Sequence, residues 1–273
     1  MKSTLEQVQE IKKHGYHLDL GEVISQTFEN YKKIALLTGG VILLLSILFI
    51  VAAAGIGGVF GLAMSFTDYF TEYSVGNFSA AVLLINLGVS VVGYALIVAP
   101  ITAGIIQIAH NAETNRDFDF STAFSHYKTS HFKDLFLSAA IITFTSSGIG
   151  TLIQLSNLYF FDAVLTTILA ILSVIVSILV PVFTLLTIPY IIFGKLDAMS
   201  AIKASIVTVS KRFWMIILLM IIFIICSMLG IIALCIGIFF TLPIYLSLQY
   251  VIYRNAIPME EKDELDEIGS SEY

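Results

Sequence analysis

Charged residues are scarce in this chain, and its long apolar runs contain none. Only 12% of the 273 residues are charged and 58% are hydrophobic, whereas soluble domains average about 25% charged and about 45–50% apolar residues. Runs without Asp, Glu, Lys or Arg cover residues 34–63, 81–110, 135–155, 163–193 and 213–253. No water-soluble fold can bury so large an apolar fraction, which excludes a soluble globular protein.

These runs have the length of membrane spans, because a helix needs about 20 residues to cross about 30 Å of hydrocarbon. The last run is too long for one helix, so we expect a turn near residues 230–237 and six transmembrane helices in three hairpins. The first run begins behind a polar segment, which is not typical of a cleaved signal peptide. We predict an all-α integral membrane protein with a polar N-terminal segment at 1–18 and a membrane domain at 19–256.

All 14 Lys and Arg residues lie in four stretches outside the apolar runs. If the runs cross a bilayer, all four stretches lie on one face. The opposite connections carry only Asp68, Glu72 and Asp162 as charged residues. Because basic loops stay in the cytoplasm during insertion, we expect a multi-pass protein of the bacterial inner membrane with both termini in the cytoplasm.

The negative charge is concentrated at the C-terminus. Residues 257–273 form an acidic segment with seven Asp and Glu residues and one lysine, and the remaining chain has 13 acidic and 13 basic residues. Such a segment repels itself and is expected to be a disordered cytoplasmic tail. Its role is solubility or the docking of a partner. Because the net charge outside the tail is zero, the chain lacks the positively charged surface that binds nucleic acid.

An internal repeat emerges when Asp19, Asp119 and Asp197 are superposed. Each is followed fourteen residues later by a lysine, at Lys33, Lys133 and Lys211, and apolar residues between them recur at offsets typical of one helix face. Each aspartate is a candidate N-cap. We therefore expect three cytoplasmic amphipathic helices of about three turns on the membrane surface, with the lysines near lipid phosphates. Lys128 replaces an apolar position, so the second helix should be weaker.

Each predicted surface helix precedes an apolar hairpin, and prolines lie in the returning helix of every hairpin. They are Pro100 in the first hairpin, Pro181 and Pro189 in the second and Pro243 in the third. Proline removes a backbone hydrogen bond and kinks a helix. The three units expected from this pattern span about 19–110, 119–193 and 197–254.

Uncharged polar side chains are the remaining candidates for function inside the membrane. They are Asn86, Gln107, Thr143, Ser146, Ser147, Gln154 and Gln249. Such groups either form hydrogen bonds between helices or line a polar cavity. Both interpretations stay open on the sequence alone.

Known catalytic and metal-binding patterns are missing from the sequence. It has no Gly-rich phosphate loop, HExxH, GxSxG or CxxC motif. Cys226 and Cys235 are too few for a disulfide framework and are expected to pack as small apolar residues. The five histidines lie on the predicted cytoplasmic side without carboxylates or thiols at a metal spacing. We predict no catalytic residue, cofactor or metal.

The segment GKLDAMSAIKASIVTVSKRFW at 194–214, followed by an apolar pair ending in TLPIYLSLQYVIYRN, resembles a group of bacterial six-span membrane proteins. The group includes YciC-like proteins and the membrane domain attached to glycerophosphoryl diester phosphodiesterases. The resemblance covers most of residues 18–256 and implies the six-span fold. It implies no phosphodiesterase activity, because the soluble catalytic barrel is absent.

Three hypotheses of function follow from these sequence patterns. The first is a non-enzymatic membrane protein that engages lipids, a protein partner or a second copy of itself. The second is a transporter for an apolar or zwitterionic molecule that gates at the proline kinks. The third, a membrane-bound enzyme such as a carotenoid cleavage enzyme, is disfavoured because His110, the histidine nearest the bilayer, lies only at its edge.

Overall fold

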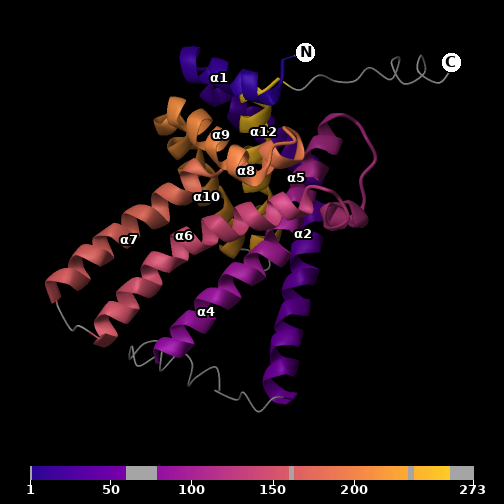
Figure 1. Cartoon of the computed structure of the whole chain (residues 1–273). Helices are drawn as coiled ribbons and strands as arrows, with labels where there is room; N and C mark the ends of the chain where they lie inside the picture. Colours follow the sequence, from indigo (N-terminus) through magenta and orange to yellow (C-terminus); the bar gives the residue numbers. More distant parts are fainter. Residues whose placement is uncertain (1, 60–78, 160–162, 233–236, 259–273) are drawn as a thin grey trace.

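The computed structural model describes residues 2–59, 79–159, 163–232 and 237–258, and all regular structure in these ranges is helical. Figure 1 shows a compact end, which we call the head, and long helices that extend away from it. The head contains α1 (Thr4–His14), α5 (Ala99–Glu113), α8 (Thr187–Ile192), α9 (Ala198–Lys211), α12 (Pro243–Ala256) and the 3₁₀ helix η2 (Phe120–Tyr127). The long helices are α2 (Leu20–Val59), α4 (Ala80–Gly93), α6 (Phe132–Tyr159) and α7 (Ala163–Phe183). The remaining elements are the π-helix η1 (Tyr94–Val98), α10 (Phe213–Ile232) and α11 (Gly237–Thr241).

The long helices expose large apolar side chains along their length. Phe49 on α2, Val89 on α4 and Val164 on α7 are 68%, 66% and 70% exposed. Four helical stretches are long and apolar enough to cross a membrane, namely Leu20–Val51, Ala80–Glu113, Phe132–Tyr159 and Val164–Ile192. A fifth is obtained if α9 and α10, which meet at 95°, are counted as one broken span. A surface of this kind requires lipid around it, so the chain has the features of an integral membrane protein.

The last apolar run, 213–253, divides differently from the two spans that its length predicts. It forms α10, then the five-residue α11 and the 14-residue α12, and residues 233–236 lie outside the described ranges. A hydrogen bond of 2.8 Å from Thr241 Oγ1 to the Ser227 carbonyl holds α11 against α10. Neither α11 nor α12 alone has the length of a span. The described helices therefore support four or five crossings directly.

The first amphipathic segment is not a separate surface helix, contrary to the sequence-based expectation. It continues without a break into the first apolar run as the 40-residue α2. No proline or glycine separates residue 22 from residue 38, so extending the helix is easier than breaking it. At about 1.5 Å per residue, α2 is about 60 Å long, twice the hydrocarbon thickness. Its first half must therefore lie outside the lipid, where it packs into the head.

The three aspartates of the repeat pattern all lie at helix starts. Asp19 accepts a hydrogen bond of 2.8 Å from the backbone N–H of Glu22, and Asp119 and Asp197 accept equivalent bonds of 3.0 and 3.1 Å three residues on. Bonds to Ser121 and Thr122 lower the pKa of the Asp119 carboxyl, and bonds to Ser200 lower that of Asp197. The residues four positions after each aspartate, Val23, Ala123 and Ala201, are fully buried.

The second and third copies differ in the helix that follows the cap. The third is α9, a 14-residue helix as expected. The second is only the eight-residue 3₁₀ helix η2, which stops at Tyr127, just before Lys128. A lysine at the next apolar position cannot be buried against the head without losing its hydration, which accounts for the early end.

Each Asp-capped helix packs on a different helix of the head, η2 on α5, α9 on α8 and α2 on α12. In the first two pairs the Asp-capped helix follows its partner in the sequence, whereas α2 and α12 come from opposite ends of the chain. The α8–α9 pair is joined by a hydrogen bond of 2.5 Å between the hydroxyls of Tyr190 and Thr208. The α2–α12 pair is joined by a bond of 2.9 Å from Ser247 Oγ to Asn30 Oδ1. Because α5, α8 and α12 also contact one another, the head closes into a ring.

Of the four candidate kink prolines, two lie at helix starts, because Pro189 is the third residue of α8 and Pro243 the first of α12. Pro181 lies inside α7, two residues before its end. Pro100 lies inside the continuous helical stretch Ala80–Glu113, directly after η1. The missing proline N–H has little effect in the first turn of a helix. Before Pro100 the chain widens into η1, where the Ala99 N–H bonds to the Tyr94 carbonyl five residues back, and this wide turn accommodates the proline ring without a sharp kink.

Candidate functional site

A lateral apolar groove of about 910 Å³ lies below the head, between α2, η1, α5, α10, α11 and α12. Its walls include Ile42 and Phe49 of α2, Ile97 of η1, Ile224 of α10, Phe239 of α11 and Tyr245 of α12. Phe49 is 68% exposed, and Ile97 and Ile224 are each 47% exposed, so the groove opens sideways among the long helices. Its volume lies within the range of about 300–1,000 Å³ that is common for small-molecule sites.

Two of the four hydroxyl-bearing residues in the groove lining use their hydroxyl within their own helix. Ser46 Oγ donates to the Ile42 carbonyl at 2.8 Å, and Ser227 Oγ donates to the Phe223 carbonyl at 2.8 Å. Both are bonds to the preceding turn of the same helix, which satisfy the hydroxyl and leave its carbon atoms facing outward. A hydrocarbon chain therefore matches this lining better than a solvated ion, which would lose its hydration without gaining polar partners.

The groove has an irregular wall, because η1 contributes both Ile97 and Val98 to it. A π turn inside an α-helix often occurs at a functional position. On the opposite side, the junction between α11 and α12 contributes Leu242. Two helix irregularities associated with Pro100 and Pro243 thus border the same groove.

The three glutamines proposed from sequence do not line this groove. Gln107 Nε2 donates to Asn111 Oδ1 at 2.9 Å and borders a different cavity of about 760 Å³ beside η2. Gln154 is exposed near the far end of α6, and Gln249 is buried in α12. Their separate locations argue against a single polar cavity formed by all three.

The other uncharged polar candidates lie along the long helices. Ser146 Oγ on α6 donates to the Ile142 carbonyl at 2.9 Å, a bond within its own helix. Thr143 and Ser147 are half-buried on the same helix, and Asn86 is half-buried on α4. Within the described ranges, α4 and α6 pack against each other, which fits helix contacts for these residues better than a shared ligand site.

The lysines of the repeat pattern have different surroundings. Lys33 Nζ donates to the Ala112 carbonyl at 3.2 Å, at the C-terminal end of α5. Lys133 and Lys211 are exposed. A lysine at a helix C-terminus is favourable because it faces unpaired carbonyls, so Lys33 stabilises the end of α5 in the head. The exposed Lys133 and Lys211 remain available to bind anions.

The histidines are dispersed over the head. His110 Nδ1 lies 3.1 Å from the Tyr250 hydroxyl, and the rings of His126 and His131 are 6.5 Å apart. Burial, with a smaller effect of His131, lowers the pKa of His126 to about 4. Among the residues that the structure describes, no group of three His, Cys, Asp or Glu side chains could hold a metal ion.

Cys226 is a half-buried free thiol on α10, and Cys235 lies outside the described residues.

The groove and one buried polar contact in the head were not foreseen from the sequence. The groove combines residues from six elements, so no local pattern marks it. Asn30, buried in α2, donates to the Ala109 carbonyl at 2.7 Å and accepts from Ser247, thereby joining three helices. The sequence did contain a signal for this polar contact. Asn30 lies eleven residues after Asp19, and the equivalent positions of the other two copies are also polar, Ser130 and Thr208.

Comparison of the chain with protein-family models, with curated proteins and with solved structures gives no match in any of the three. The resemblance to the YciC-like group stays a prediction. Function must therefore be argued from the groove and the head.

Proposed function

We propose that this chain is a non-enzymatic protein of the bacterial inner membrane that binds a lipid acyl chain in its lateral groove. The observation that carries the proposal is the groove itself, which is almost entirely apolar and opens toward the exposed faces of the long helices. In a bilayer, acyl chains are the hydrocarbon that surrounds those faces. A groove of this lining gains contacts with a chain without leaving a polar group unpaired.

The proposed orientation places the head in the cytoplasm and the far ends of the long helices outside. The basic residues that the structure describes lie on the elements of the head or next to them in the chain, and Figure 1 places α1 and the end of α12 there as well. The positive-inside rule supports this orientation. It makes α10 the fifth span, and α11 with α12 a broken sixth span that returns to the head.

We propose further that the membrane domain consists of three related units. The Asp caps, the buried residue four positions later and the ring of pairs α5–η2, α8–α9 and α12–α2 support this proposal. In such a ring each unit completes the packing of another, as in repeat proteins whose units cannot bury their apolar faces alone.

The test is photolabelling in vesicles with a phospholipid that carries a diazirine near the end of its acyl chain. Labelled residues would be mapped by mass spectrometry of the full-length protein. We expect Phe49 and Ile224, which line the groove, to be labelled several times more than Val89, which lies on α4 and is about as exposed as Phe49 and more exposed than Ile224. Equal labelling of all three residues would refute a lipid site.

A substitution that fills the groove provides the matched test. Thr102 lines the groove and is half-buried, whereas Ser90 is exposed on α4. Thr102→Phe should lower groove labelling while leaving the labelling of Val89 unchanged, and Ser90→Phe should change neither. Unchanged groove labelling in a folded Thr102→Phe variant would also contradict the proposal.

A transporter is the second candidate, favoured by the helix irregularities at the groove. Transporters bind substrates where helices are broken within the membrane, and η1 and the α11–α12 junction are interruptions of regular α-helix that border the groove. Proteoliposomes that move an apolar or zwitterionic solute would favour this candidate if Pro100→Ala, which permits a regular α-helix, stopped the flux. Acyl-chain labelling without any solute flux would favour lipid binding.

A further inference from the structure

A second pocket lies at the corner where α9 meets α10. It has a volume of about 570 Å³, and its lining includes Lys211, Arg212, Phe213 and Trp214. The two helices meet at 95°, so α9 lies parallel to the membrane surface if α10 crosses the bilayer. The corner is then at the level of the lipid headgroups.

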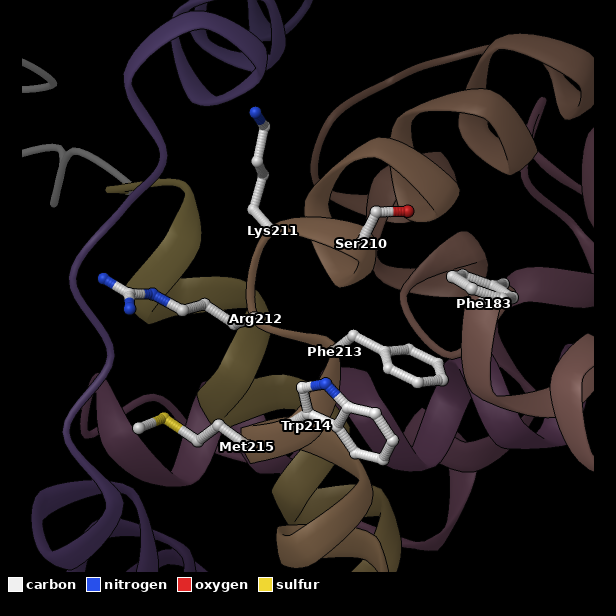
Figure 2. A pocket seen from close by; sticks show the side chains of 7 residues that line it. All are labelled: Phe183, Ser210, Lys211, Arg212, Phe213, Trp214 and Met215. Carbon is white, nitrogen blue, oxygen red and sulfur yellow. The ribbon is translucent and has the colours of Figure 1, made fainter.

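The charged and the aromatic side chains of this corner lie on different sides of it, which would suit a ligand with a charged end and an apolar end. Figure 2 shows the Lys211 side chain pointing away from the rings of Phe213 and Trp214, and Arg212 extending toward the N-terminal segment. The two basic residues precede α10, and the aromatic residues form its first turn. Chain order therefore places the cations on the head side and the rings on the lipid side.

The Arg212 side chain is held in place by the head. Its Nε donates to the Tyr16 carbonyl at 2.8 Å, while the residue remains exposed. This bond uses one of the five guanidinium donors and leaves the terminal nitrogens to face an anion. Neither Lys211 nor Arg212 forms an ion pair with a carboxylate among the residues that the structure describes.

The aromatic side of the corner is suited to the membrane interface. Trp214 is 79% exposed, and its ring packs edge-on against Phe213 at 5.3 Å. Phe213 in turn stacks on Phe183 at the end of α7, with ring centres 5.2 Å apart. Tryptophan prefers the interface because one part of its ring is apolar and its N–H can bond to polar groups.

We propose that the α9–α10 corner binds the phosphate headgroup of an anionic phospholipid, with Lys211 and Arg212 facing the phosphate and Trp214 lying beside the upper acyl chain. Arginine and lysine are the residues that bind phosphate, and anionic lipids are attracted to basic residues at the cytoplasmic surface. This site rests on the membrane orientation proposed above and is separate from the acyl-chain groove.

Trp214 makes the proposal measurable, because it is the only tryptophan in the chain. The full-length protein would be reconstituted in phosphatidylcholine vesicles that contain a brominated phospholipid, whose bromine atoms quench nearby tryptophan. Brominated phosphatidylglycerol and brominated phosphatidylcholine would be compared at equal mole fraction. We expect the anionic lipid to associate about fivefold more strongly for each basic residue engaged.

Three variants separate the site from general charge effects. Lys211→Gln and Arg212→Gln should each reduce the preference for phosphatidylglycerol, and Lys203→Gln, which removes an exposed charge from the body of α9, should retain it. Among the residues that the structure describes, the Lys211 side chain has no hydrogen-bond partner that its loss would leave unpaired, so Lys211→Gln tests the site even if Arg212→Gln disturbs the fold. A preference that persists in both variants would overturn the headgroup site.

The outcomes also distinguish the headgroup site from the membrane orientation. Equal quenching by the two brominated lipids would refute the headgroup site alone and leave Trp214 in the membrane. No quenching by either lipid would place the corner away from the bilayer and would overturn the proposed orientation as well. If an excess of inorganic phosphate abolished the preference, the site would bind free phosphate, and the lipid assignment would be wrong.

Discussion

Gly104 provides a direct test of the contact between α5 and η2. A Cβ atom added at this position would lie 2.5 Å from the carbonyl carbon and 2.7 Å from the Cα of Ala123. Carbon atoms pack at about 3.5–4.0 Å, so α5 and η2 would have to separate by about 1 Å. Backbone atoms cannot rotate out of the way as a flexible side chain can.

The expected magnitude for Gly104→Ala follows from two opposing effects. Overpacking of this kind costs about 1–3 kcal/mol, whereas replacing glycine by alanine inside a helix stabilises by about 1 kcal/mol. The net effect should be a loss of about 0–2 kcal/mol in the free energy of unfolding. A separation of about 1 Å would also weaken the packing of the neighbouring buried groups.

The control is Gly88→Ala on α4, where an added Cβ would have no atom within 4 Å. This variant should be neutral or more stable by up to about 1 kcal/mol. Both variants would be unfolded by SDS in mixed micelles and followed by far-ultraviolet circular dichroism. If Gly104→Ala proved as stable as Gly88→Ala, the close contact between α5 and the Ala123 backbone would be wrong.

Two further predictions concern buried polar groups of the head. Asn30→Ala removes the side chain that bonds to the Ala109 carbonyl and the Ser247 hydroxyl. It should lower the free energy of unfolding by about 2–4 kcal/mol in the same assay. The control, Glu29→Ala at an exposed position, should change the free energy of unfolding by less than about 0.5 kcal/mol. For His126, burial lowers the pKa in the folded state from 6.5 to about 4. As the pH falls, the unfolded state therefore binds the proton before the folded state does. Up to about 3 kcal/mol of the free energy of unfolding is lost between about pH 6.5 and about pH 4. His126→Asn should remove this part of the pH dependence, and identical pH profiles of the variant and the wild type would contradict the assignment.

The features that could be predicted from the sequence are those that depend on residues close together in the chain, such as apolar runs and helix caps. The apolar runs predicted long membrane-compatible helices, because a run without charges has no other stable environment. The Asp caps could be anticipated since a cap depends on a carboxylate and on the N–H groups within the next three residues. The boundary between α9 and α10 could also be anticipated, because the Asp197–Lys211 pattern ends just before the apolar run that begins at Phe213.

Other features depend on distant contacts and could not be predicted. Whether α2 breaks after Lys33 depends on how its first half packs against α12, more than 200 residues away in sequence. The effect of Pro100 could not be foreseen either, because both a kink and a π turn accommodate a proline. The groove requires six elements to be positioned together. For the glutamines, the sequence left open both a polar cavity and hydrogen bonds between helices, because their spacing from the prolines does not determine their distance from one another in space.

The central claim is that the head lies in the cytoplasm and the far ends of the long helices lie outside. It is tested most directly by labelling single cysteines with a membrane-impermeant maleimide, in a chain whose Cys226 and Cys235 are replaced by alanine. Arg116→Cys and Lys203→Cys, both exposed on the head, should react only after the cells are permeabilised. Ala81→Cys, exposed at the far end of α4, should react in intact spheroplasts. Labelling of position 116 or 203 from outside would contradict the orientation and the lipid sites that depend on it.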